Sequence, residues 1–273
     1  MEIINAVNLS FKYKKGITVL DNIDLLIERG KKTAILGKNG SGKSTLMKLI
    51  TGLLQANNGK LLINGYDINS TEGKKYIREH FGIVFQNPDN QFVSPIVEED
   101  IKFGLKNHRI SKEEYASRIN DSLNKVNLQG YEKKTINTLS GGQKQRAATA
   151  DILAIHPDIF IFDESTSMLD PVGRSEVLNC IHNLENENKT IIVITQNVDD
   201  ILDADFIYLF ADHKILASGK PDEILTDYST LEHAGIQIPF PVRVYFDLKK
   251  KGINLPFCPL TLEKLAEEIC SLN

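Results

Sequence analysis

A glycine-rich segment between two apolar runs constrains the fold of this chain more than any other feature. Residues 37–44 read GKNGSGKS and fit the pattern G-x-x-x-x-G-K-[ST]. The short apolar run KTAIL precedes them. The run that follows carries apolar residues at helical spacing, namely Leu46, Leu49, Ile50 and Leu53. The sequence therefore predicts a strand, a tight turn and a helix, an arrangement that presents backbone N–H groups to a phosphate.

The residue types in this turn suit a nucleoside triphosphate. Glycines let the backbone curl so that successive N–H groups point inward, and Lys43 would reach the β- and γ-phosphates. Ser44 would ligate Mg²⁺, so ATP and Mg²⁺ are the predicted cofactors. An ordinary glycine turn is the alternative, but it explains neither the strand before nor the helix after. The candidate nucleotide-binding residues here are Gly37, Asn39, Gly40, Ser41, Gly42, Lys43, Ser44 and Thr45.

A second segment, IFIFDE, supplies two carboxylates at the end of a buried strand. In open α/β sheets, ligands bind at the carboxyl ends of the strands. We expect Asp163 to hold Mg²⁺ and Glu164 to orient, or to accept a proton from, an attacking water. A solvated strand end is the alternative when this segment is considered alone.

The rest of the chain alternates between strand-like and helix-like segments. This alternation over residues 33–210 predicts an α/β fold with a mostly parallel core sheet covered on both faces. The first ~30 residues read as antiparallel strands, and Asn64-Gly65 is expected at the tip of a hairpin. The predicted fold class is a P-loop NTPase with an antiparallel β subdomain and a helical subdomain at about 90–140. A domain over residues 1–220 and a helical extension over 221–273 are expected.

Composition excludes several classes of protein. No apolar run among the 273 residues approaches the roughly 18–20 needed to span a bilayer. A net charge of −4 argues against broad attraction to nucleic acid. The three cysteines lie far apart with no C-x-x-C spacing, so free thiols are expected.

A third segment, LSGGQKQR, indicates a second anion site. Ser140 and Gln143 have the spacing of a capping box, and two glycines between them expose N–H groups at a helix start. With this segment the chain resembles the ATP-binding-cassette (ABC) family. That resemblance implies that two cassettes pack head to tail and that the segment of each caps the γ-phosphate held by the other, through Ser140, Gly142 and Gln143.

Other positions match the family one by one. Tyr13 resembles the aromatic residue that stacks on adenine, although an ordinary exposed tyrosine of a sheet is the alternative. Gln86 resembles the glutamine that contacts Mg²⁺ or water and responds to the membrane partner, and is also a candidate catalytic residue. Asp170 resembles the acidic residue of a loop that crosses to the opposite site.

The segments FQNPDNQFV, STSMLDP and IPFPVRVYFDLKKKGINLP narrow the resemblance to the ATPases of energy-coupling-factor (ECF) transporters for vitamins and transition-metal ions. NPDNQFVSPIVEEDIKFGL is closer to the first of the two ATPases that such transporters usually contain. The resemblance implies three partners: a second homologous ATPase, a transmembrane coupling (T) protein and a substrate-binding membrane (S) protein. It also implies a peripheral location at the cytoplasmic face of the cell membrane. The C-terminal helices would pair across the dimer or pack on the chain's own sheet.

Two residues depart from the family pattern. Gln196 stands where a histidine normally contacts the γ-phosphate and the attacking water. An amide can donate a hydrogen bond but carries no charge, so we expect slow hydrolysis at the site on this chain's own loop. Asp151 follows the signature segment where a small or apolar residue is expected, and is predicted to be an exposed helical carboxylate.

Two other functions are considered. A soluble ABC ATPase acting on ribosomes or nucleic acid usually carries two cassettes or a long coiled coil, and this chain has one cassette and no sustained heptads. A P-loop kinase offers no use for the signature segment. The leading prediction is an ATP-hydrolysing subunit of an importer, with Glu164, Gln196 and Gln86 as its catalytic residues.

Overall fold

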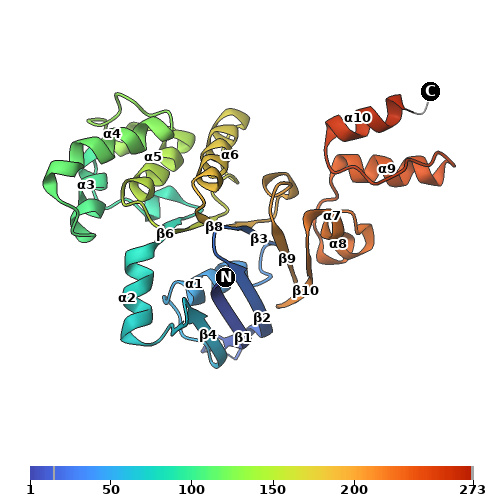
Figure 1. The fold of residues 1–273 in the computed structure, drawn as a ribbon, viewed down its shortest axis with the longest axis horizontal. Helices are drawn as coiled ribbons and strands as arrows, with labels where there is room; N and C mark the ends of the chain where they lie inside the picture. The colour runs from blue at the N-terminus through green and yellow to red at the C-terminus, as the bar shows by residue number, and fades with distance from the viewer. Residues whose placement is uncertain (15, 272–273) are drawn as a thin grey trace.

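A six-stranded sheet forms the centre of the computed structural model, which describes residues 1–14 and 16–271 (Figure 1). Its order is β10-β9-β3-β8-β7-β6, and every pairing is parallel except that of β9 with β10. The predicted mostly parallel core is therefore confirmed. The strands are β3 (Lys32–Gly37), β6 (Phe81–Val84), β7 (Ile159–Asp163), β8 (Thr190–Thr195), β9 (Phe206–Ala211) and β10 (Lys214–Gly219).

The parallel strands are buried on both faces, which is why their sequences are continuous apolar runs rather than alternating ones. Every residue of β3, β7 and β8 is buried. Because these three strands run in the same direction side by side, their carboxyl ends meet at one edge of the sheet. That edge brings together the glycine-rich turn, the acidic pair and Gln196.

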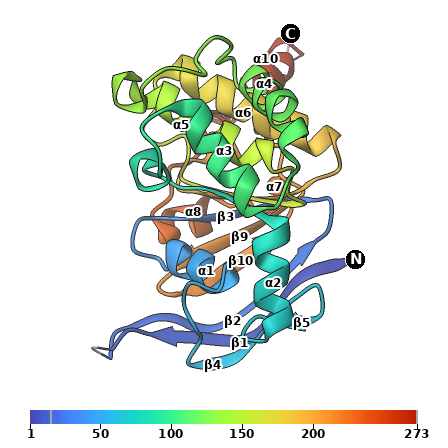
Figure 2. The ribbon, with the colours of Figure 1, turned by 90° about the vertical axis from the view of Figure 1, so that its left-hand side faces the viewer.

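A second, antiparallel sheet has the order β2-β1-β4-β5. Its strands are β1 (Glu2–Lys12), β2 (Thr18–Glu28), β4 (Asn58–Ile63) and β5 (Tyr66–Asp67). Asn64 (φ 49°) and Gly65 (φ 79°) lie between β4 and β5, and two positive φ angles are what a type I′ hairpin turn requires. The predicted hairpin is confirmed. Figure 2 shows α1 (Lys43–Ile50) between this sheet and the core sheet.

Helix α1 is one turn shorter than its apolar spacing suggested. Leu46, Leu49 and Ile50 are buried, but the helix ends at Ile50, and Leu53 is 61% exposed. Gly52 has φ 71° and reverses the chain before Leu53 can join the apolar face. The predicted placement of Leu53 on that face was therefore wrong.

Helix α2 (Thr71–His80) lies on the same side as α1, beside the antiparallel sheet (Figures 1 and 2). The other face of the core sheet is covered by α3 (Val97–Asn107), α4 (Tyr115–Lys125), α5 (Gly141–Ala154) and α6 (Pro171–Asn186). Short 3₁₀ turns are formed by Pro88–Asn90, Lys112–Glu114, Ile136–Thr138 and Val198–Asp200. Helix α5 packs on both α3 and α4. Asp151 of α5 is only 9% exposed, so the prediction of an exposed carboxylate was wrong. The burial follows from α5 being enclosed by neighbours on several sides.

The C-terminal segment forms α7 (Pro221–Ile224), α8 (Tyr228–Ala234), α9 (Phe240–Lys250) and α10 (Leu262–Cys270). Leu231 of α8 and Val242 of α9 are fully buried in the same apolar cluster as the core sheet. Leu262 of α10 is 58% exposed, so part of the extension's apolar surface stays uncovered. Among the described residues, none of the helices has the length and apolar character required to cross a membrane.

Candidate nucleotide-binding site

The glycine-rich turn connects β3 to α1 and lines an open pocket of about 240 Å³. Gly42 is the residue before α1 and has φ 110°, where a β-carbon would come within 2.7 Å of the Val19 carbonyl oxygen. Glycine is therefore required there for backbone and steric reasons alike. Residues from four separate stretches line the pocket: Val19, Asn39, Gly40, Gly42, Lys43, Ser44, Thr45, Gln86 and Glu164.

Lys43 is buried beneath the turn and held by its backbone. Its ammonium donates to the carbonyl oxygens of Gly37 (2.7 Å) and Lys38 (3.1 Å) and lies 3.4 Å from Glu164 Oε1. Burial lowers the pKa of Lys43, against the opposing influence of the neighbouring carboxylates. Hydrogen bonds from an ammonium group to charged phosphate oxygens are stronger than those to neutral carbonyl oxygens, so Lys43 can exchange its backbone acceptors for a phosphate.

Two acidic side chains stand at the end of β7, as predicted, and both are only 6% exposed. Burial and the nearby charge of Glu164 raise the pKa of Asp163 to about 6. Among the described residues, Asp163 Oδ1 is buried and has no hydrogen-bond partner, and the Ser44 hydroxyl lies near the same carboxyl group. Glu164 has φ 47°, a left-handed conformation that is rare for non-glycine residues and concentrates at functional sites.

Two glutamines flank the acidic pair. Gln86, just after β6, donates from Nε2 to Glu164 Oε2 at 2.8 Å. Gln196 follows β8 directly and is exposed. The strand pairing puts Ile194 beside Asp163, and the Glu164 N–H donates to the Ile194 carbonyl at 2.8 Å. Gln196 therefore lies at the same sheet edge as Glu164.

Tyr13 directly follows β1 of the antiparallel sheet, near the start of α1. Its hydroxyl is 3.4 Å from Thr45 Oγ1, its ring makes an edge contact with Phe11, and it is 41% exposed. An exposed aromatic face next to the start of α1 is available for stacking on a base.

The signature segment lies apart from this pocket. Ser140 accepts from the Gln143 N–H (3.3 Å) and the Gln143 side chain accepts from the Ser140 N–H (3.0 Å), so the predicted capping box at the start of α5 is present. Asp170 caps α6 by accepting from the Gly173 N–H at 2.7 Å. Gly173 lies against Gly142, so the two helix starts are neighbours. Neither Ser140 nor Asp170 lines the pocket.

A family model described as "ABC transporter" matches residues 20–167, which include the phosphate-binding turn, the signature segment and the acidic pair. The chain belongs to the ABC transporter family. This ABC ATPase is 43% identical, over 99% of its length and 96% of the relative's, to a protein of Ligilactobacillus salivarius named energy-coupling factor transporter ATP-binding protein EcfA1.

Solved structures agree with this assignment. One is CbiO1 of Clostridium perfringens, described as part of the ABC transporter complex CbiONQ, with TM-score 0.76 and 32% identity over 89% of this chain and 98% of that one. Another is the ATP-binding cassette MJ0796 in a dimeric post-hydrolysis state bound to ADP and Pi, with TM-score 0.74 and 28% identity over 80% of this chain and 99% of that one. The chain is thus an ATPase of the ABC fold.

The sequence analysis did not identify Asp200, whose hydrogen bonds fix the segment that follows the acidic end of β7. Buried Asp200 accepts through Oδ2 from the hydroxyls of Thr166 (2.8 Å) and Thr195 (3.0 Å), and through Oδ1 from Arg174 (2.9 Å). It therefore connects the segment after Glu164, the end of β8 and α6. A single aspartate in a polar stretch carries no signal for such a role.

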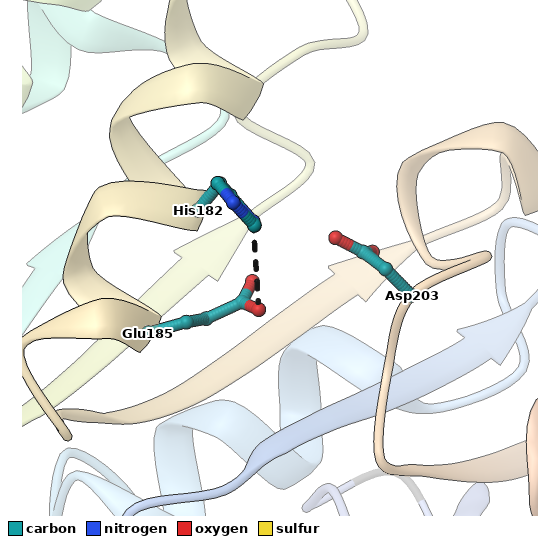
Figure 3. A group of neighbouring side chains, drawn as sticks. All are labelled: His182, Glu185 and Asp203. Atoms are coloured by element: carbon teal, nitrogen blue, oxygen red, sulfur yellow. Dashed lines mark ion pairs between the residues drawn. The ribbon is translucent and has the colours of Figure 1, made fainter.

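Another group of charged side chains lies at the opposite edge of the sheet. His182, Glu185 and Asp203 come close enough to share a cation (Figure 3). The buried Lys32 ammonium already occupies that position, 2.9 Å from Glu185 and 2.6 Å from Asp203. The carboxylates of this cluster are therefore neutralised by a side chain of the ABC ATPase itself, and the cluster joins α6 to the sheet.

Proposed function

We propose that this chain is the ATP-hydrolysing subunit of an ECF-type importer for vitamins or transition-metal ions, and that it works as one of a pair of ATPases. The observation that carries the proposal is the separation of two half-sites on one chain. A complete cradle for a triphosphate surrounds Lys43, whereas the exposed start of α5 contributes nothing to that cradle. A second phosphate-binding surface on the same chain has a use when it closes on another subunit's nucleotide.

Within the cradle, we assign nucleotide binding to residues of the glycine-rich turn and to Tyr13. Backbone N–H groups and the Lys43 ammonium would bind the β- and γ-phosphates, and Tyr13 would stack on the base. The unpartnered Asp163 Oδ1 and the nearby Ser44 hydroxyl are hard oxygen donors of the kind Mg²⁺ prefers, and Gln86 could add its amide oxygen. Bound Mg²⁺ would neutralise phosphate charge.

Hydrolysis in this scheme is in-line attack of water on the γ-phosphate. Glu164 would orient the water and accept its proton. The Glu164 carboxylate is itself fixed by a hydrogen bond of 2.8 Å from Gln86 Nε2 to its Oε2. Gln196 would donate its amide N–H towards the γ-phosphate from the adjacent strand end. The rest of the catalysis comes from positioning and charge, with no covalent intermediate.

Ser140, Gly142 and Gln143 would cover the γ-phosphate of the nucleotide bound to the partner ATPase, with Asp170 beside them. These first residues of the signature segment are called the lid. Exposed apolar side chains adjoin these residues, since Met168 and Val172 are 67% and 68% exposed. Apolar side chains placed next to a phosphate-binding surface favour burial against another protein. The dimeric state of the MJ0796 structure and the name EcfA1 of the Ligilactobacillus salivarius protein support a paired arrangement, with a homologous second ATPase as the companion.

A transmembrane coupling protein would dock beside the Gln86 segment at the cytoplasmic face of the membrane, with the substrate-binding protein beyond it. Val93 and Phe103 near this segment are 65% and 44% exposed and offer an apolar contact. The printed description of CbiO1 as part of a CbiONQ complex supports such an assembly for this chain. No nucleic acid partner is proposed.

The proposal is tested by purifying the chain from its native membranes in mild detergent and measuring ATP hydrolysis with and without its companions. We expect a homologous ATPase and hydrophobic membrane proteins to co-purify, and hydrolysis to depend on the ATPase pair. Lys43→Ala should abolish nucleotide binding in this chain while leaving the complex assembled. Full-rate hydrolysis by a strictly monomeric chain, or co-purification with ribosomes or nucleic acid instead, would contradict the proposal.

A further inference from the structure

Two buried carboxyl groups face each other between α3 and α5, away from the nucleotide pocket. Asp100, in the first turn of α3, is 6% exposed, and Asp151 of α5 is 9% exposed. Helices α3 and α5 pack against each other, and the two carboxyl groups are close enough to interact. Asp151 Oδ2 is fully buried and has no donor among the described residues. Two ionised carboxylates could not share this position without strong repulsion.

The contacts of Asp100 indicate which of the two carries the charge. Asp100 Oδ1 accepts from the N–H groups of Val93 (2.7 Å) and Ser94 (2.5 Å). Hydrogen bonds from two backbone donors stabilise the ionised form of a carboxyl group. Asp151 has no comparable donor, so it is the member of the pair that is suited to keep a proton.

Among the described residues, neither carboxyl group of the pair forms an ion pair with a cationic side chain, and the lysine and arginine side chains nearest in sequence are engaged elsewhere. On α3, Lys102 pairs with Glu98 and Glu99. On α5, Lys144 pairs with Asp89 of the 3₁₀ turn Pro88–Asn90, and Arg146 pairs with Glu176 of α6. The charged neighbour of Asp151 is Asp100. Burial and the proximity of Asp100 raise the pKa of Asp151 well above its ordinary value.

The pair lies where the signature helix meets the segment that contains Gln86. Gln145 of α5 donates to the Phe85 carbonyl at 3.0 Å, and Gln91 donates to the Ala148 carbonyl of α5 at 2.7 Å. The carboxyl pair adds a third connection, from Asp151 through Asp100 to Val93 and Ser94. Helix α5 is thus joined to the chain on both sides of Gln86.

We propose that Asp151 and Asp100 share one proton, and that this proton positions the signature helix against the Gln86 segment. Asp151 donates its carboxyl O–H to the Asp100 carboxylate, which stays fixed by its two backbone donors. Loss of the proton replaces a hydrogen bond by repulsion between two buried charges and loosens α5, whose first residues form the lid. Asp151 is a positioning residue, and its effect on hydrolysis rests on the proposed function.

Thermal unfolding of the full chain over pH 5–8 tests the shared proton directly. Asp151→Asn keeps an N–H donor and cannot ionise. In the wild type, folded Asp151 holds a proton that the unfolded chain releases near pH 4, so stability falls as pH rises towards the raised pKa. We expect the unfolding constants of wild type and Asp151→Asn to diverge by up to about tenfold per pH unit, with the variant the more stable at pH 8.

The control is Asp121→Asn, which removes the same charge from the exposed face of α4. It should follow the pH dependence of the wild type. Asp100→Asn serves as a second variant, because its amide can accept from Val93 and donate to Asp151, and it should also flatten the pH dependence. Equal pH slopes for the wild type and both variants of the pair would overturn the inference.

Hydrolysis by the assembled ATPase pair over pH 6–9 supplies the functional readout. The wild type should lose rate on the alkaline side more steeply than Asp151→Asn, whereas Asp151→Ala should be slower at every pH. A hydrolysis rate that is retained in Asp151→Asn but lost in Asp151→Ala would show that a hydrogen-bond donor at position 151 positions the helix. A divergence in stability with no hydrolysis by any pair would refute the proposed function and leave the shared proton supported. If the wild type and Asp151→Asn lost hydrolysis rate equally as the pH rises, the positioning role would be refuted.

Discussion

Replacing Gln196 by histidine is expected to accelerate hydrolysis at the site on this chain's own glycine-rich turn. Gln196 is exposed, and Thr195 before it is held by Asp200 at 3.0 Å, so the backbone position should survive the change. Loss of a preorganised donor typically costs about 3 kcal/mol of transition-state stabilisation. Because the amide already supplies a neutral donor, the gain from histidine should be smaller, about 1.4–2.7 kcal/mol, or roughly 10- to 100-fold in rate.

The assay is single-turnover hydrolysis in the assembled pair, with the companion's own site silenced by substitution of its catalytic glutamate. Gln196→Ala completes a series in which the rate should rise from Ala to Gln to His. The advantage of histidine should grow as the pH falls from 8 to 6, because protonation adds positive charge next to the γ-phosphate. A rate for Gln196→His within twofold of the wild type would refute the slow-site reasoning.

Three further substitutions probe the site and its supports. Glu164→Gln should lower hydrolysis at least about 100-fold and leave ATP binding intact, as measured by nucleotide titration and product formation. Asp200→Ala should lower the free energy of unfolding by about 3–5 kcal/mol in denaturant titrations, because it leaves buried hydroxyls and Arg174 without their acceptor. Lys32→Met should cost about 1–3 kcal/mol and lower the melting temperature, because it leaves two carboxylates facing each other.

The Lys32 substitution has a matched control, and the other two have outcomes that would contradict them. Lys31→Met removes the neighbouring lysine, whose pair with Asp205 is half-exposed, and should leave the free energy of unfolding nearly unchanged. Equal losses for Lys31→Met and Lys32→Met would contradict the neutralising role assigned to the buried ammonium. Unchanged stability in Asp200→Ala would mean that water replaces its bonds. Loss of ATP binding in Glu164→Gln would show that the carboxylate organises the cradle.

Local patterns sufficed for the parts of this protein that are built from contiguous backbone. The glycine-rich turn, the acidic strand end and the capping box at Ser140 depend on residues a few positions apart, and their conformations follow from local sterics and hydrogen bonding. The Asn64-Gly65 hairpin was predictable for the same reason. Buried parallel strands were recognisable because a strand covered on both faces must be apolar throughout.

Burial and pairing between distant segments were decided only by the tertiary structure. Asp151 lies on a helix of mixed small and polar residues, whose composition does not indicate which faces are enclosed. The roles of Asp200 and Lys32 arise from elements that meet across the sheet. Whether a charge is exposed, neutralised or forced to keep its proton depends on neighbours tens of residues away, and no local periodicity records them. The sequence alone therefore determined the chemistry of the cradle, and the packing of α3, α5 and the core sheet decided how that chemistry is supported.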